Sequence, residues 1–228
     1  MLETIGIIGR GHIGSALQKG LERAGFVQIM TSNNATDNMN VVNNSNIVFL
    51  AVRPVIACEV LEQIESSVKD KILVSLVAGL SISIQDVSVF RLMTSLLISE
   101  NMGLNVAWTA QDTDVQAKKT VGSLLSCLAS TQWVDSEDEI DKATLTVGAG
   151  PGWMAEIIAN LDQEMLQQTL AFMGKTGLTA TQFAQMIATP GGITEAMIAT
   201  QDFKSRLELS FEQGSSRMEL IKQEYRKV

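Results

Sequence analysis

A glycine-rich turn close to the N-terminus constrains the fold more than any other feature of this sequence. Residues 4–17, "TIGIIGRGHIGSAL", place Gly9, Gly11 and Gly14 in the spacing G-x-G-x-x-G. The apolar run before the glycines is typical of a buried strand, and the apolar residues after them recur at helical spacing. Glycine permits the tight turn and the close approach of a pyrophosphate that dinucleotide-binding βαβ units require. The segment therefore predicts a dinucleotide site at the start of a helix.

The segments that follow the glycine turn alternate between strand and helix patterns. Short apolar runs predict strands over residues 4–9, 26–32, 46–52 and 71–79. Helical spacing predicts helices over residues 13–25 and 55–68. Strands that alternate with helices favour a parallel sheet with crossover helices. We therefore expect an α/β fold with a Rossmann-type, doubly wound parallel sheet, followed by a smaller all-helical domain.

The connection between the second and third predicted strands has an unusual composition. Residues 32–46 contain seven asparagines in fifteen positions. Asparagine favours turns and helix caps and weakens helix interiors. The sequence therefore predicts an abbreviated crossover here, with at most one short helical turn around residues 39–42.

The pattern changes at about Asp135, beyond which helical signals dominate. We expect a dinucleotide-binding domain over residues 1–134 and a helical substrate and dimerisation domain over residues 135–228. Acidic residues gather at 135–141, and we interpret them as the charged first turn of a helix, where carboxylates are favourable. The C-terminal segment 217–228 is interpreted as an amphipathic, solvated helix end.

The residues at the end of the second strand bear on the choice of cofactor. Ser32, Asn33 and Asn34 stand where a carboxylate would bind the ribose 2′-hydroxyl of NAD and repel a 2′-phosphate. Neutral side chains tolerate the phosphate, so NADP(H) is favoured over NAD(H), and Arg10 is a candidate to reach it. His12 is the only histidine, and we interpret it as a contact to phosphate or backbone rather than a catalytic group.

Composition excludes several other classes of function. The formal net charge of −8 disfavours nucleic acid or an anionic membrane as a partner. Two cysteines and one histidine do not make a metal cluster, so no metal site is expected. The longest apolar stretch, residues 72–80, is far shorter than the ~20 residues that span a bilayer. With no basic leader pattern at the N-terminus, we expect a cytoplasmic protein.

Five separated stretches resemble the pyrroline-5-carboxylate reductase family, which reduces a cyclic imine to proline with NADPH or NADH. They lie at residues 6–21, 47–54, 72–82, 135–153 and 189–197. The glycine fingerprint is shared by many families, but the segments "GAGPGW" and "TPGGIT" in tandem are more specific. The resemblance implies an NAD(P)-dependent oxidoreductase acting on the C–N bond of a small cyclic imine in proline biosynthesis, as a homodimer.

The glycine turn and the end of the second strand supply one group of predicted cofactor contacts: Gly9, Gly11, His12, Ile13, Gly14, Ser32, Asn33 and Asn34. The resemblance adds a second group: Ala51, Val52, Arg53, Pro54, Ala78 and Gly79. It implies that a carboxylate substrate lies near Gly148, Gly150 and Pro151 and is held by the main-chain N–H groups of Gly191, Gly192 and Ile193. The Thr194 hydroxyl would approach the ring nitrogen, which makes Thr194 the candidate catalytic proton donor.

The sequence departs from the family at two places. Thr94, Ser95, Leu96 and Leu97 replace the last four residues of its M-P-N-T-P segment, so a polar, rigid turn becomes a more flexible and apolar one. The stretch between Gly150 and Thr189 is shorter than in the family. These departures leave two alternatives open: a reductase of another imine or carbonyl compound, or a catalytically inactive nucleotide-binding or regulatory protein on the same scaffold.

Overall fold

The computed structural model describes residues 3–188, 190–193 and 203–225, and these residues form two compact units. One unit comprises the described residues up to Pro151 together with those from Gly214, and the other comprises those between Gly152 and Gln213. Residues 135–151 and the end of the last helix therefore pack with the sheet, whereas the sequence pattern assigned both segments to the helical domain.

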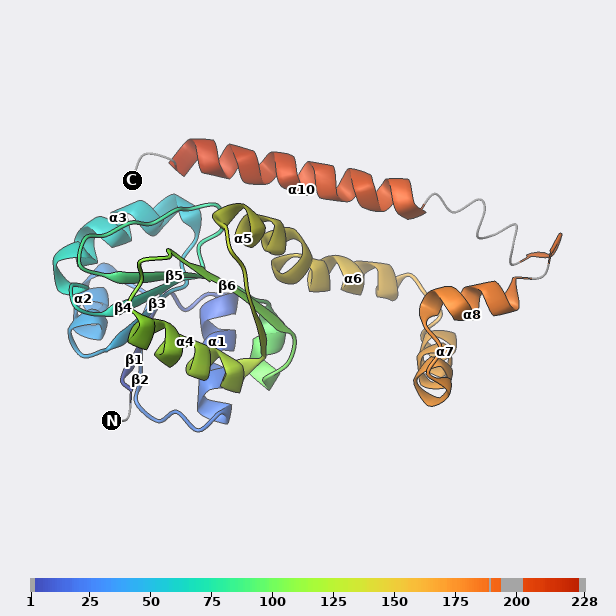
Figure 1. The fold of residues 1–228 in the computed structure, drawn as a ribbon, viewed down its shortest axis with the longest axis horizontal. Coiled ribbons are helices and arrows are strands. Elements are labelled where there is room, and N and C mark those ends of the chain that lie inside the picture. The colour runs from blue at the N-terminus through green and yellow to red at the C-terminus, as the bar shows by residue number, and fades with distance from the viewer. Residues whose placement is uncertain (1–2, 189, 194–202, 226–228) are drawn as a thin grey trace. The chain divides into compact units, whose positions relative to one another are not determined.

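The first unit is built on a seven-stranded sheet with the order β2-β1-β3-β4-β5-β6-β7. The strands are β1 (Ile5–Ile8), β2 (Ile29–Ser32), β3 (Ile47–Leu50), β4 (Ile72–Ser75), β5 (Ser88–Met93), β6 (Leu104–Thr109) and β7 (Ser130–Trp133). Neighbouring strands are parallel except β5 and β6, which are antiparallel. The predicted Rossmann-type α/β fold is confirmed (Figure 1). Because β1 lies between β2 and β3, the order reverses beside the glycine turn, where such sheets bind ligands.

Helices connect and follow the strands (Figure 1). In the first part of the chain they are α1 (His12–Arg23), α2 (Ala35–Asn43), α3 (Pro54–Ile64) and α4 (Val115–Leu128). They are followed by α5 (Glu137–Ala143), α6 (Gly150–Ala159), α7 (Gln163–Thr176), α8 (Ala180–Ile187) and α10 (Phe203–Tyr225). Short helical turns are η1 (Glu65–Ser67), η2 (Leu96–Glu100) and η3 (Thr144–Gly148).

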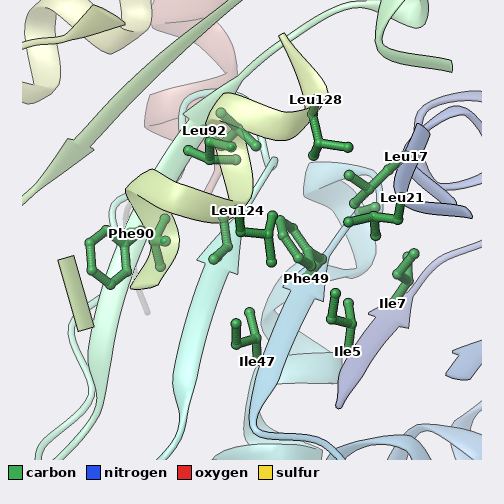
Figure 2. Packing of buried hydrophobic residues seen from close by; sticks show 14 of the residues in the cluster. Ile5, Ile7, Leu17, Leu21, Ile47, Phe49, Phe90, Leu92, Leu124 and Leu128 are labelled. Atoms are coloured by element: carbon green, nitrogen blue, oxygen red, sulfur yellow. The ribbon is translucent and has the colours of Figure 1, made fainter. Parts of the chain in front are cut away.

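Two apolar cores cover the two faces of the sheet. Figure 2 shows one of them, where Ile5, Ile47 and Phe49 of the strands lie near Leu17 of α1 and Leu124 of α4. The second core joins the opposite strand faces to α2 and α3. Side chains alternate between the two faces of a strand, so strands covered on both sides must be apolar throughout. β3, fully buried along its length, follows this rule.

The prediction of an abbreviated crossover between β2 and β3 was wrong, because α2 is a helix of nine residues. Its asparagines form hydrogen bonds at the two helix ends and at one buried position, and they do not interrupt the helix. Asn34 is the N-cap residue, and its Oδ1 accepts a hydrogen bond of 2.9 Å from the Asp37 backbone N–H. At the other end, Asn44 Nδ2 donates to the Asn40 carbonyl at 2.8 Å. Asn38 is buried and bonds to neighbouring polar side chains.

The end of α10 is packed against the sheet unit, so the prediction of a solvated helix end was wrong for one of its faces. Met218 is buried. A Cβ on Gly79, in the loop after β4, would lie 3.0 Å from Met218 Sδ and 3.1 Å from Ile221 Cγ2. Glycine is suited to this position because its φ of +69° and the approaching helix both disfavour a side chain.

The helices of the second unit expose many apolar side chains. None of the residues of α6, α7 or α8 is buried. Phe172 and Phe183 contact each other, with ring centroids 5.3 Å apart. In the part of the chain that the structure describes, no helix combines the length and apolar content that crossing a bilayer requires.

Candidate cofactor-binding site

The three glycines of the first turn have distinct structural roles. Gly9 has a φ of +105°, and a Cβ there would overlap the carbonyl of Ala51 at the end of β3. A Cβ on Gly14 would overlap the Gly9 carbonyl, so this glycine lets α1 pack closely on β1. A Cβ on Gly11 would meet nothing within 4 Å. Gly9 and Gly14 are therefore required by packing, whereas Gly11 leaves open space above the turn.

That open space lies at the N-terminus of α1. Gly11 is the N-cap residue and has no side chain to occupy the amides of the first turn. The helix dipole adds partial positive charge at the same place, which favours a bound anion such as a phosphate. Gly11 thus provides the opening that a pyrophosphate needs, and the residues of this turn fit a dinucleotide.

The glycine turn faces a cavity of about 1240 Å³ at the carboxyl ends of the strands. Small-ligand pockets usually measure ~300–1,000 Å³, so this one has room for an extended dinucleotide. Its lining includes these predicted site residues: Gly9, Gly11, His12, Ile13, Asn33, Asn34, Ala51, Val52, Arg53, Ala78 and Gly148. The structure therefore brings most of the predicted cofactor contacts together in one cavity.

Other predicted site residues lie away from the lining. Gly14 belongs to α1, and Pro54 lies in the first turn of α3. Ser32 is buried beneath the β2–α2 turn, and Gly79 lies under α10. Gly150 and Pro151 begin α6. Gly191, Gly192 and Ile193 belong to the second unit, and Thr194 lies outside the described residues. Their roles in binding stay predictions.

Two polar side chains that the sequence analysis did not single out, Asn38 and Gln63, join Ser32 in bracing the turn between β2 and α2. Ser32 Oγ donates to Asn38 Oδ1 at 2.6 Å, and Asn38 Nδ2 donates to Gln63 Oε1 at 3.1 Å. Gln63 Nε2 donates in turn to the Ala35 carbonyl at 2.5 Å. This chain of hydrogen bonds ties the turn to α3. Ser32 thus positions the segment that carries Asn33 and Asn34 toward the cavity.

The segment that replaces M-P-N-T-P is anchored at its far end. Thr94 and Ser95 are buried and line the cavity, whereas Leu96 and Leu97 are 54% and 44% exposed. Ile98 is fully buried where η2 packs against α1, and a Cβ on Gly20 would overlap its carbonyl. The replacement therefore presents two small hydroxyl side chains to the cavity and an apolar Leu96 at its edge.

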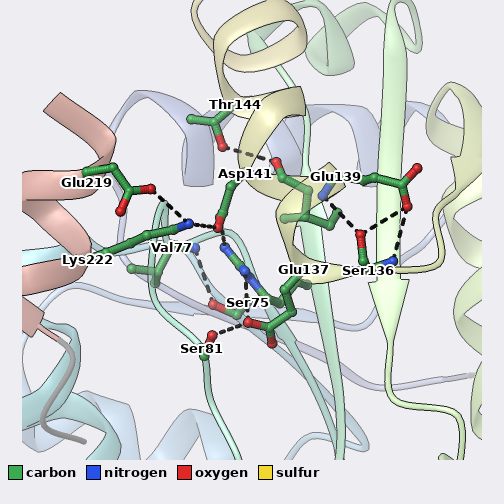
Figure 3. Close-up of polar contacts among 12 residues, drawn as sticks. Ser75, Val77, Ser81, Ser136, Glu137, Glu139, Asp141, Thr144, Glu219 and Lys222 are labelled. Carbon is green, nitrogen blue, oxygen red and sulfur yellow. Dashed lines mark hydrogen bonds and ion pairs between the residues drawn. The ribbon is translucent and has the colours of Figure 1, made fainter. Parts of the chain in front are cut away.

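A buried arginine lies close to this wall of the cavity. Arg91 of β5 is 1% exposed, and its guanidinium lies 2.8 Å from Asp141 Oδ1 and 3.4 Å from Glu137 Oε2. Glu137 also accepts a hydrogen bond from Ser81 (Figure 3). The acidic segment begins a helix as predicted, with a capping box between Ser136 and Glu139.

The inward role of two of these acidic residues was missed by sequence reasoning. Glu137 and Asp141 are four positions apart, so they share one face of α5. The spacing could have indicated a common partner, but it could not identify Arg91 on a distant strand.

The fold and the glycine turn together define a dinucleotide-binding protein of the Rossmann class. Within that class, the chain is similar to pyrroline-5-carboxylate reductases along nearly its whole length. It is 25% identical to pyrroline-5-carboxylate reductase 2 of Bacillus subtilis, over 98% of this chain and 97% of the relative. That alignment spans 273 positions, more than the 228 residues of this chain, so the relative has residues that this chain lacks. The enzyme of Corynebacterium melassecola is 26% identical over 86% of this chain and 89% of its own.

Solved structures agree on the fold. Pyrroline carboxylate reductase of Plasmodium falciparum, solved with NADP bound, has a TM-score of 0.80 at 20% identity, covering 96% of this chain and 98% of that one. The enzyme of Streptococcus pyogenes has a TM-score of 0.75 at 18% identity, covering 97% and 98%. Residues 31–79 also match the family described as NADP oxidoreductase, coenzyme F420-dependent. These comparisons confirm the resemblance that the sequence stretches indicated.

Proposed function

We propose that this chain is an NAD(P)H-dependent reductase of a small cyclic imine, of the pyrroline-5-carboxylate reductase type. The observation that carries the proposal is the open position at Gly11, at the head of α1 and on the wall of a dinucleotide-sized cavity. The similarity to curated pyrroline-5-carboxylate reductases along nearly the whole chain supports the choice of reaction. When bound, the reduced nicotinamide supplies the hydride, and the protein contributes positioning.

The residues of the cavity support NADP(H) over NAD(H) as the preferred cofactor. The amides at the head of α1 would hold the pyrophosphate, and Asn33 and Asn34 would face the adenosine ribose. Neither asparagine repels a 2′-phosphate, and the same cavity is lined by three cationic side chains, Arg10, Lys19 and Arg53, against one carboxylate, Glu59. Both features favour the extra negative charge of NADP(H).

We propose that the main-chain N–H groups of Gly191, Gly192 and Ile193 hold the substrate carboxylate. Glycines let the backbone approach an anion closely, and Gly191 has a φ of +72°, which an L-residue with a side chain rarely adopts. Thr194 is the second residue after Gly192 and is proposed to deliver a proton to the ring nitrogen, either itself or through a water molecule. In the sheet unit, Gly148 lines the cofactor cavity, and its contact to the substrate stays part of the proposal.

We also propose that the protein is a cytoplasmic homodimer. Exposed apolar side chains lie along α6, α7 and α8, among them Ile158, Leu170 and Met186. Burial of such side chains yields ~25 cal/mol for each Å² removed from water, so a second copy of the same helices is a favourable cover. Light scattering on the purified protein tests this proposal: the expected mass is twice 24.7 kDa, and a monomer would contradict it.

Leu96 and Leu97 favour a second candidate, reduction of another imine or carbonyl compound. Both exposed apolar side chains lie where the family has a polar turn, and Leu96, which lines the cavity, would suit a substrate with an apolar substituent. An inactive nucleotide-binding protein on the same scaffold is the third possibility.

One paired experiment separates the three candidates. NADPH and NADH are titrated onto the protein, and their oxidation is followed with pyrroline-5-carboxylate and with other cyclic imines. Oxidation with pyrroline-5-carboxylate supports the proposal, and oxidation with another imine alone supports the second candidate. Nucleotide binding without turnover of any imine supports the third.

A further inference from the structure

The buried guanidinium of Arg91 joins two parts of the sheet unit. Its side chain is almost fully excluded from solvent, and it reaches Asp141 and Glu137 of α5 at 2.8 and 3.4 Å. Burying an unpaired charge costs several kcal/mol of folding free energy, so the buried guanidinium of Arg91 requires these two carboxylates as partners. The pairing therefore holds α5 against β5.

A second cation reaches the same carboxylate from the end of the chain. Lys222 Nζ on α10 lies 2.7 Å from Asp141 Oδ2 and 3.3 Å from Glu219 Oε1 (Figure 3). Each oxygen of Asp141 thus pairs with a cation from a different segment. Although burial disfavours the charged ammonium, the hydrogen bonds and charges of Asp141 and Glu219 raise the pKa of Lys222 above its ordinary value of 10.5.

Close packing accompanies this ion pair. Gly214 lies so near η3 that a Cβ there would be 2.7 Å from Leu145 Cδ2. Further along α10, Met218 is buried against the loop that contains Gly79. The end of α10 is therefore fixed by shape as well as by charge.

The segments that meet at this network continue directly into the cofactor cavity. β5 ends at Met93 and leads into Thr94 and Ser95, and these three residues line the cavity. α5 leads into η3, whose Thr144 and Gly148 line it as well. Ala78, the neighbour of Gly79, is a further lining residue, on a third segment beside the network. Movement of α10 would therefore be transmitted to one wall of the cavity.

We propose that Lys222 is a positioning residue for the cofactor site. By pairing with Asp141 it docks the end of α10 and holds the segments 93–95 and 144–148 in the arrangement that binds the dinucleotide. The inference rests on the proposed cofactor site. Because coupling between two events is reciprocal, bound dinucleotide must also stabilise the docked end of α10.

The test compares NADPH affinity among three variants by fluorescence titration. Lys222→Met removes the charge and keeps much of the apolar stem, and we expect it to weaken NADPH binding about 5- to 20-fold, within the usual range of coupling between sites. Lys222→Arg keeps the charge and should bind NADPH within about twofold of the wild type. Arg217→Met is the control on the same helix, because Arg217 is exposed and its ion pair to Glu224 is 3.8 Å long; its affinity should be unchanged.

Hydrogen exchange supplies a second readout that does not depend on the variants folding equally well. In the wild type, NADPH should slow amide exchange in residues 214–225 as well as in 93–95 and 144–148. Slowing confined to the glycine turn, or unchanged affinity in Lys222→Met, would overturn the inference while the proposed function stands. A wild-type protein that binds neither NADPH nor NADH would overturn both.

Discussion

Arg91 and Asp141, fifty positions apart in the sequence, form an ion pair of 2.8 Å in which both side chains are nearly excluded from solvent. The pair joins the fifth strand to α5, two elements that carry part of the cofactor cavity at their ends. Its energetic and functional consequences are both open to measurement.

Removing the carboxylate should destabilise the protein strongly. Asp141→Ala leaves Arg91 buried with only the longer contact to Glu137, and a broken buried pair usually costs about 3–5 kcal/mol in the free energy of unfolding. Glu100→Ala is a matched control, because the Arg23–Glu100 pair is more than half exposed and should contribute no more than about 1 kcal/mol. Urea unfolding measures both. Similar losses from the two substitutions would contradict the structural role of Asp141.

The contribution of Lys222 to stability should depend on pH in one direction. Its pKa is raised in the folded protein, so the contribution is fully present below the ordinary value of 10.5 and is lost as pH rises through the higher folded value. The difference in free energy of unfolding between wild type and Lys222→Met should therefore be constant from neutral pH to about 9.5 and should shrink above about 10.5. Urea unfolding across this range provides the measurement. A difference that disappears already near neutral pH would disagree with the assignment.

The first part of the fold was predictable because its signals are local. The glycine spacing, the apolar runs and the helical periodicity between residues 4 and 79 each depend on neighbours in the sequence, and β1, β3 and β4 lie within the predicted ranges. The asparagine-rich crossover was mispredicted because asparagine acts through hydrogen bonds that depend on position. At the ends of α2 it caps the helix, and at Asn38 it finds buried partners that no propensity reveals.

The residues of the candidate site also fall into those that local sequence identifies and those that depend on distant partners. Gly9, Gly11 and Gly14 were identifiable because the glycine motif specifies both the residues and their use. Gln63 and Arg91 were not identifiable, since each acts through a residue far away in the sequence. Their positions emerge only when the sheet brings α3 and α5 beside the strands.

Substitutions at two glycines of the turn should affect different properties, nucleotide affinity at Gly11 and stability at Gly14. A Cβ at Gly11 enters open space, so Gly11→Ala should keep the stability of the wild type yet weaken NADPH binding by about tenfold or more, a loss of ~1.4 kcal/mol or greater. A Cβ at Gly14 meets the Gly9 carbonyl, so Gly14→Ala should cost about 1–3 kcal/mol of stability by overpacking. Thermal unfolding together with nucleotide titration distinguishes them. Normal affinity in Gly11→Ala would show that the pyrophosphate lies elsewhere.

A carboxylate at the end of β2 should change the cofactor preference. Asn33 is exposed and lines the cavity, so Asn33→Asp leaves the core untouched. The new charge would repel the 2′-phosphate of NADPH and offer a partner to the 2′-hydroxyl of NADH. We expect the ratio of NADPH to NADH affinity to fall by about tenfold, on the order of 1.4 kcal/mol. Asn33→Ala is the control for loss of the amide alone. An unchanged ratio in Asn33→Asp would place the adenosine ribose away from this turn.

The central claim is that a hydride passes to the carbon of a cyclic imine from the nicotinamide of a cofactor whose pyrophosphate lies at the glycine turn. It is tested most directly with NADPH that carries deuterium at the transferable position of the nicotinamide, incubated with pyrroline-5-carboxylate and the purified protein. We expect mass spectrometry to find proline with deuterium on the former imine carbon, formed in step with NADPH oxidation. Absence of proline, or proline without the label, would contradict the claim.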